Sequence, residues 1–227
     1  MEKLGTNYGG WYVPKYMKLN ENSIVYSGGV GEDMSFDILL NAKYNCNIFL
    51  IDPTKKAIEH FKQVKLFYNN NIKFNGNIQN DYYSKINTSK PNLNKLYYIN
   101  KGLWDCKTNL KFYKQLNENY VSQSVIENMF TDSYDIIEVD TIKNIMKENN
   151  HTKIDLLKLD IEGAEIKVID QMFNDAIYPD FLLIEFDLLL KHKDKDNLTQ
   201  TLITRIIQTE NYKMLINDNF NITFIKS

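Results

Sequence analysis

The chain has 227 residues, a formal net charge of -2, and acidic and basic residues that are interspersed along its length. This length fits one α/β domain, and the lack of a basic stripe argues against a nucleic-acid partner, so we expect a small or neutral substrate. The two cysteines and the lack of an apolar run of about 20 residues argue against a disulfide scaffold and a membrane span, so we expect a cytoplasmic protein with no membrane partner.

Strand-like and helix-like segments alternate along the chain. Apolar or β-prone runs bounded by turn residues predict strands at residues 23–27, 47–51, 96–99, 154–159 and 181–184. Segments with a helical apolar face predict helices at residues 32–44, 55–64, 141–147, 162–173 and 197–209. Repeated strand-then-helix units are typical of a mostly parallel sheet with helices on both faces.

Three regions depart from this alternation. Residues 66–91 are dense in Asn and Lys and predict an irregular or partly helical excursion. Residues 102–140 contain short β-like pieces at 110–113 and 136–139, and we expect substrate-specific structure there. The segment from residue 212 to 225 predicts a closing antiparallel hairpin.

The domain organisation that follows is simple. We expect residues 23–227 to form a single domain and residues 1–22 to be an N-terminal extension. The tyrosine-rich stretch from Tyr8 to Tyr16 could cover a site as a lid, mediate oligomer contacts or pack on the sheet.

A glycine loop follows the first strand of this domain. Gly28, Gly29 and Gly31 allow a sharp turn and a close approach of the backbone to a ligand. Asp52 ends the second strand, where a carboxylate can accept hydrogen bonds from both ribose hydroxyls of a nucleoside cofactor. Together these residues predict a cofactor site at the carboxyl ends of the strands.

The type of cofactor depends on the residues after the glycines. In a dinucleotide-binding G-x-G-x-x-G pattern that starts at Gly29, the third glycine position is occupied by Met34. Glu32 and Asp33 place negative charge where a pyrophosphate would lie, whereas the positively charged sulfonium and amino groups of S-adenosylmethionine would be favoured there. The acids therefore favour a cationic cofactor over NAD or NADP.

The most distinctive segment is Leu-Lys-Leu-Asp-Ile-Glu-Gly-Ala-Glu at residues 157–165. Glu162 and Glu165 would share a helix face, where acids stabilise the helix N-terminus. Asp160 would project from the strand end beside the cofactor, and we interpret it as a functional residue.

This segment resembles the K-x-D-x-E-G-x-E signature of the FkbM family of methyltransferases. Residues 25–33, 49–54, 100–104 and 182–186 are similar to further family segments and occur in the same order. The resemblance implies a doubly wound, Rossmann-like class I methyltransferase fold that binds S-adenosylmethionine. It also implies O-methylation of a hydroxyl on a sugar, glycan or small metabolite.

The resemblance further implies roles for individual residues. It places the cofactor against Gly28, Gly29, Gly31 and Glu32, its ribose at Asp52, and its adenine beside Pro53, Gly102 and Leu103, with Asp160 facing the methyl group. Many class I methyltransferases end the first strand with an acidic residue, but Tyr26 and Ser27 stand here. Glu32 or Asp33 would then contact the amino-acid end of the cofactor.

Methyl transfer to a hydroxyl requires alignment of the acceptor and a base that removes its proton. The candidate catalytic residues are Asp160, Glu162 and Glu185, without a firm order among them. The three histidines are scattered, so we expect no metal ion. Two alternatives stay open: an NAD(P)-dependent oxidoreductase, and a nucleoside-binding module without catalytic activity.

Overall fold

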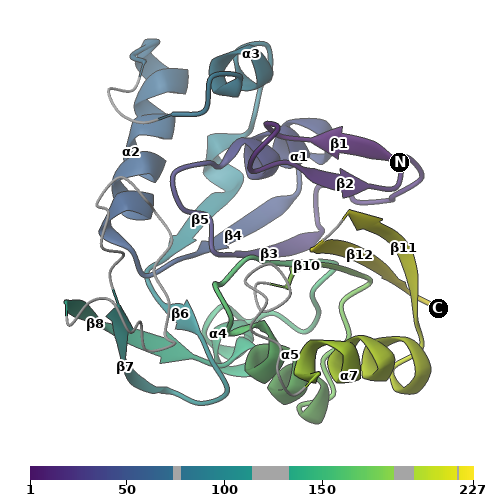
Figure 1. Ribbon diagram of the computed structural model, residues 1–227. Helices are drawn as coiled ribbons and strands as arrows, with labels where there is room; N and C mark the ends of the chain where they lie inside the picture. The colour runs from purple at the N-terminus through teal and green to yellow at the C-terminus, as the bar shows by residue number, and fades with distance from the viewer. Residues whose placement is uncertain (74–77, 114–132, 187–196, 219) are drawn as a thin grey trace.

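A seven-stranded sheet forms the centre of the molecule (Figure 1). The computed structural model describes residues 1–73, 78–113, 133–186, 197–218 and 220–227. The strands of the sheet, in spatial order, are β11 (Tyr212–Asp218), β12 (Asn221–Lys226), β10 (Phe181–Glu185), β9 (Leu156–Leu159), β3 (Ile24–Gly28), β4 (Asn47–Ile51) and β5 (Leu96–Ile99). Of these seven strands, β12 alone runs in the direction opposite to the other six, which confirms the predicted mostly parallel sheet with a C-terminal antiparallel hairpin.

Helices cover both faces of this sheet, as Figure 1 shows. The helices are α1 (Ser35–Tyr44), α2 (Lys55–Asn70), α3 (Tyr82–Ile86), α4 (Ile142–Glu148), α5 (Glu165–Asn174) and α7 (Leu198–Thr204), together with the short helices η1 (Leu93–Lys95) and η2 (Arg205–Thr209). The chain moves outward from β3 to β5 and then returns to β9 beside β3. Because parallel crossovers are right-handed, this reversal places the two groups of helices on opposite faces.

Alternate residues of each central strand belong to two separate hydrophobic cores. Val25 and Leu156 pack with residues of α1, α2 and α3, whereas Tyr26 and Leu157 pack with residues of α4, α5 and α7. Side chains of a strand point to opposite faces in turn, so both faces are buried here. This double burial explains why the strands are continuous apolar runs in the sequence.

The N-terminal residues form a hairpin that was not predicted. Strand β1 (Glu2–Leu4) pairs antiparallel with β2 (Trp11–Val13), and Leu4, Trp11 and Val13 are buried in the core that contains α1. The Thr223 hydroxyl of β12 donates a hydrogen bond of 2.9 Å to the carbonyl oxygen of Tyr12. The hairpin therefore packs against the same body as the rest of the chain.

A second, three-stranded sheet lies beside the central one. Its strands are β6 (Gly102–Leu103), β8 (Tyr134–Asp140) and β7 (Thr108–Tyr113), in that order. These strands confirm and extend the short β-like pieces that the sequence predicts. Residues 114–132 of the same stretch are outside the described part of the chain.

Helix α2 is longer than predicted. Phe67 continues the buried stripe of Ala57, Phe61 and Val64, so the helix runs beyond residue 64 to Asn70 and ends at Asn71, whose φ is 56°. The segment at residues 66–91 is thus partly helical, as one of the two predicted forms allowed, because it contains the end of α2 and all of α3.

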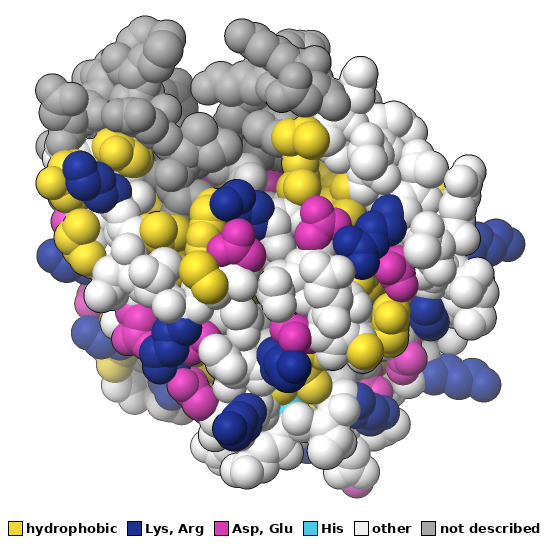
Figure 2. All heavy atoms as spheres, turned by 90° about the horizontal axis from the view of Figure 1, so that it is seen from below, with side chains coloured by type: hydrophobic (Ala, Val, Ile, Leu, Met, Phe, Trp, Pro, Cys, Tyr) yellow, Lys and Arg dark blue, Asp and Glu magenta, His cyan; other side chains and the backbone are white. Residues whose placement is uncertain are grey.

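Within the described residues, no helix is long and apolar enough to cross a bilayer. On the face of the molecule that Figure 2 shows, acidic and basic side chains are interspersed, without a broad area of one sign.

Asp37 is a buried acid on the inner side of α1, with 2% of its surface exposed. Burial raises its pKa to about 6, against the opposing charge of Lys158. A pKa above the unfolded value of 3.8 means that Asp37 contributes stability that is complete below that value and is lost as the pH rises through about 6.

We therefore expect Asp37→Asn to gain stability relative to the wild type, by up to about 3 kcal/mol, when the pH is raised from about 4 to about 7.5. Urea unfolding of both proteins at the two pH values measures this difference. Glu59→Gln, at an exposed position of α2, is the control and should show no such change. If the difference in the free energy of unfolding between Asp37→Asn and the wild type were the same at both pH values, the prediction would be contradicted.

Candidate functional site

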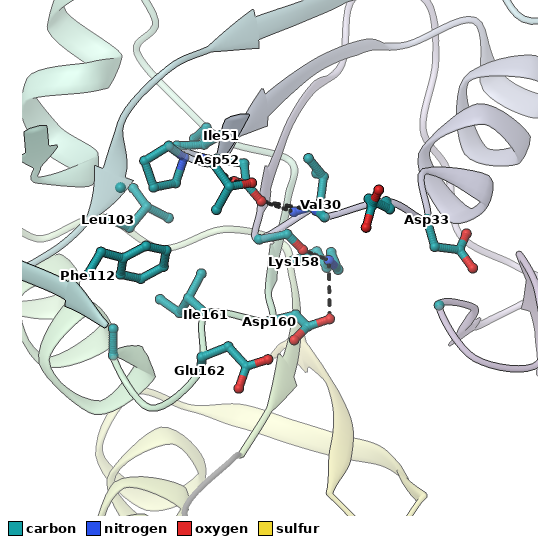
Figure 3. Close-up of a pocket in the computed structure, with 18 of the residues that line it drawn as sticks. Val30, Asp33, Ile51, Asp52, Leu103, Phe112, Lys158, Asp160, Ile161 and Glu162 are labelled. Atoms are coloured by element: carbon teal, nitrogen blue, oxygen red, sulfur yellow. Dashed lines mark hydrogen bonds and ion pairs between the residues drawn. The ribbon is translucent and has the colours of Figure 1, made fainter. Parts of the chain in front are cut away.

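A cavity of about 350 Å³ opens where β3, β4 and β9 end (Figure 3). Its walls come from the glycine loop after β3, the residues after β4, the loop after β9, the small sheet and the N-terminal hairpin. In a sheet of this type, ligands bind at the carboxyl ends of strands where the strand order reverses. The cavity lies at that point, between β3 and β9.

The glycine loop is held tightly against the neighbouring strand ends. Gly29 has a φ of +72°, and a Cβ atom there would lie 1.6 Å from the carbonyl oxygen of Asp160. Its N–H donates a hydrogen bond of 3.0 Å to the carbonyl oxygen of Ile51. Both the positive φ and the close contact require glycine at position 29.

Asp52 fastens this loop to the end of β4. Its Oδ2 accepts hydrogen bonds of 3.0 Å from the backbone N–H groups of Val30 and Gly31, and its Oδ1 accepts from the N–H and the hydroxyl of Thr54 at 2.8 and 2.7 Å. A carboxylate has about four acceptor sites. Asp52, the residue predicted to bind a ribose, thus lines the cavity, and its carboxylate also organises the loop.

The two acids after the glycines have different surroundings. Asp33 accepts a hydrogen bond of 3.0 Å from the N–H of Ser35 and another from the hydroxyl of Thr6. Helix α1 begins only at Ser35, three residues later than predicted, because residues 32–34 belong to the loop that precedes it. Glu32 lines the cavity and lies 4.0 Å from Lys56. Asp33 lines the cavity as well, so both acids are placed where a ligand could reach them.

The loop after β9 differs from the prediction. Glu162 has a φ of +58° and Gly163 a φ of +104°, so helix α5 begins at Glu165 and not at Glu162. The buried Glu165 carboxylate accepts hydrogen bonds of 3.1 Å from the N–H groups of Ile161 and Gly163. The predicted shared helix face of Glu162 and Glu165 is therefore wrong: Glu165 supports the loop, and Glu162 lines the cavity.

Two of the three predicted catalytic acids, Asp160 and Glu162, line the cavity. Glu185 is not among the described lining residues, but its side chain is close enough to Asp160 for a hydrogen bond. Removal from water raises the pKa of Asp160; the positive charge of Lys158 opposes this shift and the negative charge of Glu162 adds to it. Asp160 is therefore suited to take up a proton at a higher pH than an ordinary aspartate.

Lys158 is a part of the site that the sequence analysis missed. Only 6% of its side chain is exposed, and its Nζ lies 2.7 Å from the carbonyl oxygen of Gly29 and 3.7 Å from Oδ2 of Asp160. It joins the glycine loop to the acid, as the dashed line in Figure 3 shows for Asp160. In the sequence it is one polar residue in an apolar strand, a signal that could have marked it.

The opposite end of the cavity is apolar. Pro53, Gly102 and Leu103, the residues predicted to border an adenine, line it together with Phe112 and Ile161. Figure 3 shows Leu103 and Phe112 on one side of the cavity and Asp33 on the other, with Ile161, Glu162 and Asp160 between them. Phe112 was not predicted, although the alternation of Leu110 and Phe112 with polar residues indicated a buried strand face. In the parts of the chain that the structure describes, no three His, Cys, Asp or Glu side chains are grouped so that they could hold a metal ion.

The model of the methyltransferase FkbM domain family matches residues 30–213. The chain belongs to this family. Among solved structures, the chain is similar to the crystal structure of methyltransferase FkbM from Methylobacillus flagellatus KT, with a TM-score of 0.53 and 13% sequence identity. The match covers 92% of this chain and 45% of that one, so this chain spans less than half of that protein's length. No curated protein matches the chain.

These comparisons confirm the predicted FkbM family and an α/β fold with a mostly parallel central sheet. The matched residues include Asp52, Asp160 and Glu185, and they exclude the N-terminal hairpin. The FkbM domain therefore contains the acids at the strand ends, and one wall of the cavity comes from outside the matched region.

Glu162 in this FkbM domain allows a test of backbone strain. A residue other than glycine in the left-handed backbone conformation lowers the stability of the fold by about 1 kcal/mol or more. We expect Glu162→Gly to be more stable than Glu162→Ala by about 1 kcal/mol, measured by urea unfolding. At Lys62, inside α2, the order should be reversed, because glycine destabilises a helix interior. If the glycine variant were less stable than the alanine variant at position 162 as well as at position 62, the backbone of Glu162 would not be strained.

Proposed function

We propose that the chain is an S-adenosylmethionine-dependent methyltransferase that methylates a hydroxyl of a sugar, glycan or small metabolite. We assign residues 23–227 to one doubly wound, Rossmann-like class I methyltransferase domain, with residues 1–22 as the N-terminal part that packs on it. We also propose a cytoplasmic location. The observation that carries the proposal is the division of the cavity into an apolar end and an acidic end.

The apolar end suits an adenine ring. Pro53, Leu103 and Phe112 provide apolar surfaces, while Gly102 leaves no room for a side chain because a Cβ atom there would lie 2.9 Å from Cγ1 of Val139. The backbone at Gly28, Gly29 and Gly31 leads from this end to the acidic one. Both carboxylate oxygens of Asp52 already accept hydrogen bonds. Asp52 would bind the ribose if one of them exchanged a present donor for a sugar hydroxyl.

The acidic end suits a cation. Glu32, Asp160 and Glu162 line the cavity, and among the described lining residues Lys158 is the one basic side chain. Such surroundings attract a sulfonium and an ammonium group and repel a pyrophosphate. This charge distribution disfavours the NAD(P) alternative, and the close carboxyl groups of Asp160 and Glu185 favour an enzyme over a binding module without chemistry.

S-adenosylmethionine supplies an electrophilic methyl group, and the residues of the chain would supply alignment and proton transfer. One of the paired carboxylates, Asp160 or Glu185, would accept the proton of the acceptor hydroxyl. Lys158 would keep Asp160 in place and stabilise its negative charge. Glu162 would orient the acceptor from the edge of the loop.

Calorimetric titration with S-adenosylhomocysteine, NAD and NADP tests the proposal. We expect micromolar binding of S-adenosylhomocysteine and none of the two dinucleotides. An acceptor screen that begins with sugars would then follow. Failure to bind S-adenosylhomocysteine, or binding of a dinucleotide, would overturn the proposed cofactor.

A further inference from the structure

The turn of the N-terminal hairpin reaches the acidic end of the cavity. Tyr8 and Gly9 line the cavity, together with Asp160 and Glu162. The family match begins at residue 30, so these two residues are outside it. A segment far away in the sequence thus completes the wall of the site.

This turn is fastened to the body of the protein by polar contacts. The N–H of Thr6 donates a hydrogen bond of 2.8 Å to the hydroxyl of Ser35, and its own hydroxyl donates to Asp33. The N–H of Asn7 donates a hydrogen bond of 2.8 Å to Oδ2 of Asp81. The backbone on both sides of Tyr8 is therefore held in a defined position.

Gly9 brings the turn especially close to Asp33, just before α1. A Cβ atom at Gly9 would lie 2.7 Å from Cγ of Asp33, and its N–H donates a hydrogen bond of 2.9 Å to the hydroxyl of Thr6. Any larger residue would push the turn away from the cavity. The close approach keeps Tyr8 at the cavity wall.

The side chain of Tyr8 combines an accessible ring with nearby negative charge. Its relative exposure is 68%, and partial burial of the phenol, followed by the charges of Asp160, Glu162 and Glu185, raises its pKa. The phenol is therefore neutral at physiological pH. Of the described residues that line the cavity, Tyr8 and Phe112 carry aromatic rings, and Phe112 lies at the apolar end.

An aromatic ring beside several carboxylates is a binding site for an organic cation. We propose that Tyr8 is a ligand-binding residue whose ring contacts the positively charged centre of the cofactor, with Asp160, Glu162 and Glu185 supplying the negative charge. This inference rests on the proposed function, because it requires a cofactor with a sulfonium group.

The test compares two ligands that differ in that charge. S-adenosylmethionine carries the sulfonium, and S-adenosylhomocysteine has a neutral sulfur. Calorimetry would measure both affinities for the wild type, Tyr8→Leu and Tyr8→Phe. Tyr16→Leu is the matched control, because Tyr16 is 62% exposed and does not line the cavity.

For Tyr8→Leu we expect the affinity for S-adenosylmethionine to fall about three- to tenfold more than that for S-adenosylhomocysteine. Tyr8→Phe, which retains the ring, and Tyr16→Leu should leave the ratio of the two affinities unchanged. An equal loss of both affinities in Tyr8→Leu, or no loss of either, would overturn the role of Tyr8 while leaving the proposed function intact. Failure of the wild type to bind both ligands would instead overturn the proposed function itself.

Discussion

Replacing Asp52 by alanine is expected to lower the affinity for S-adenosylhomocysteine about 100-fold or more. The change removes the acceptor of the N–H groups of Val30 and Gly31, so the glycine loop loses its attachment to β4. Hydrogen bonds to a charged acceptor contribute about 1.5–3 kcal/mol each, and a loss of about 2.7 kcal/mol corresponds to a hundredfold change in affinity. Calorimetry measures the affinity, and circular dichroism verifies that the sheet is folded.

Asp155→Ala is the matched control for this experiment. Asp155 is also buried and accepts a hydrogen bond of 2.7 Å from the N–H of Ile24, but at the opposite end of the same sheet. We expect both variants to lose about 1–4 kcal/mol of stability, and only Asp52→Ala to lose ligand binding. Near-normal affinity of Asp52→Ala would refute a role of Asp52 in the cofactor site.

Asp160→Asn is expected to keep its affinity for S-adenosylhomocysteine within about threefold and to lower kcat for an identified acceptor about 100- to 1000-fold. The amide has nearly the same shape as the carboxyl group but cannot accept the proton. Because the pKa of Asp160 is raised by its removal from water, the wild-type rate should fall with decreasing pH at values above those of an ordinary aspartate. In the variant, the rate should no longer show this fall at acidic pH, the acid limb of the pH–rate profile.

Glu185→Gln is the informative comparison, because Glu185 and Asp160 are close enough to share a proton. If Asp160 is the base, Glu185→Gln shifts the acid limb and leaves most of the rate. Full activity of Asp160→Asn would remove Asp160 as the base, and loss of the limb in Glu185→Gln alone would assign that role to Glu185.

The central strands could be predicted because each is an apolar run that ends at a turn residue or an acid. Asp52, Asp160 and Glu185 occur at or directly after such strand ends, so their common edge followed from the parallel arrangement alone. The glycine loop could also be predicted, because a sharp turn with a positive φ, such as that of Gly29, is favoured by glycine over other residues.

The remaining site residues depend on contacts between distant segments. Tyr8 reaches the cavity because Thr6 and Asn7 find partners on α1 and before α3. The tyrosine-rich sequence left a lid, oligomer contacts and packing on the sheet equally open. Lys158 is buried because its charge meets carbonyl groups of the glycine loop, which belong to another strand. Local patterns contain no information on such pairings.

The start of α5 was predicted too early for a different reason. The acids at 162 and 165 have the spacing of a helix face, but Gly163 and the left-handed Glu162 form a turn instead. The side chain of Glu165 stabilises this turn by accepting two backbone hydrogen bonds, a tertiary feature that competes with the helical pattern.

The contact between Gly29 and the carbonyl oxygen of Asp160 limits how this protein can change over evolution. A side chain at position 29 would fit only if the backbone at Asp160 moved away, and that movement would displace the acid from the cavity. The two positions are therefore expected to vary together or not at all among descendants of this sequence. A mutagenesis library that diversifies position 29 alone should yield active clones that all retain glycine.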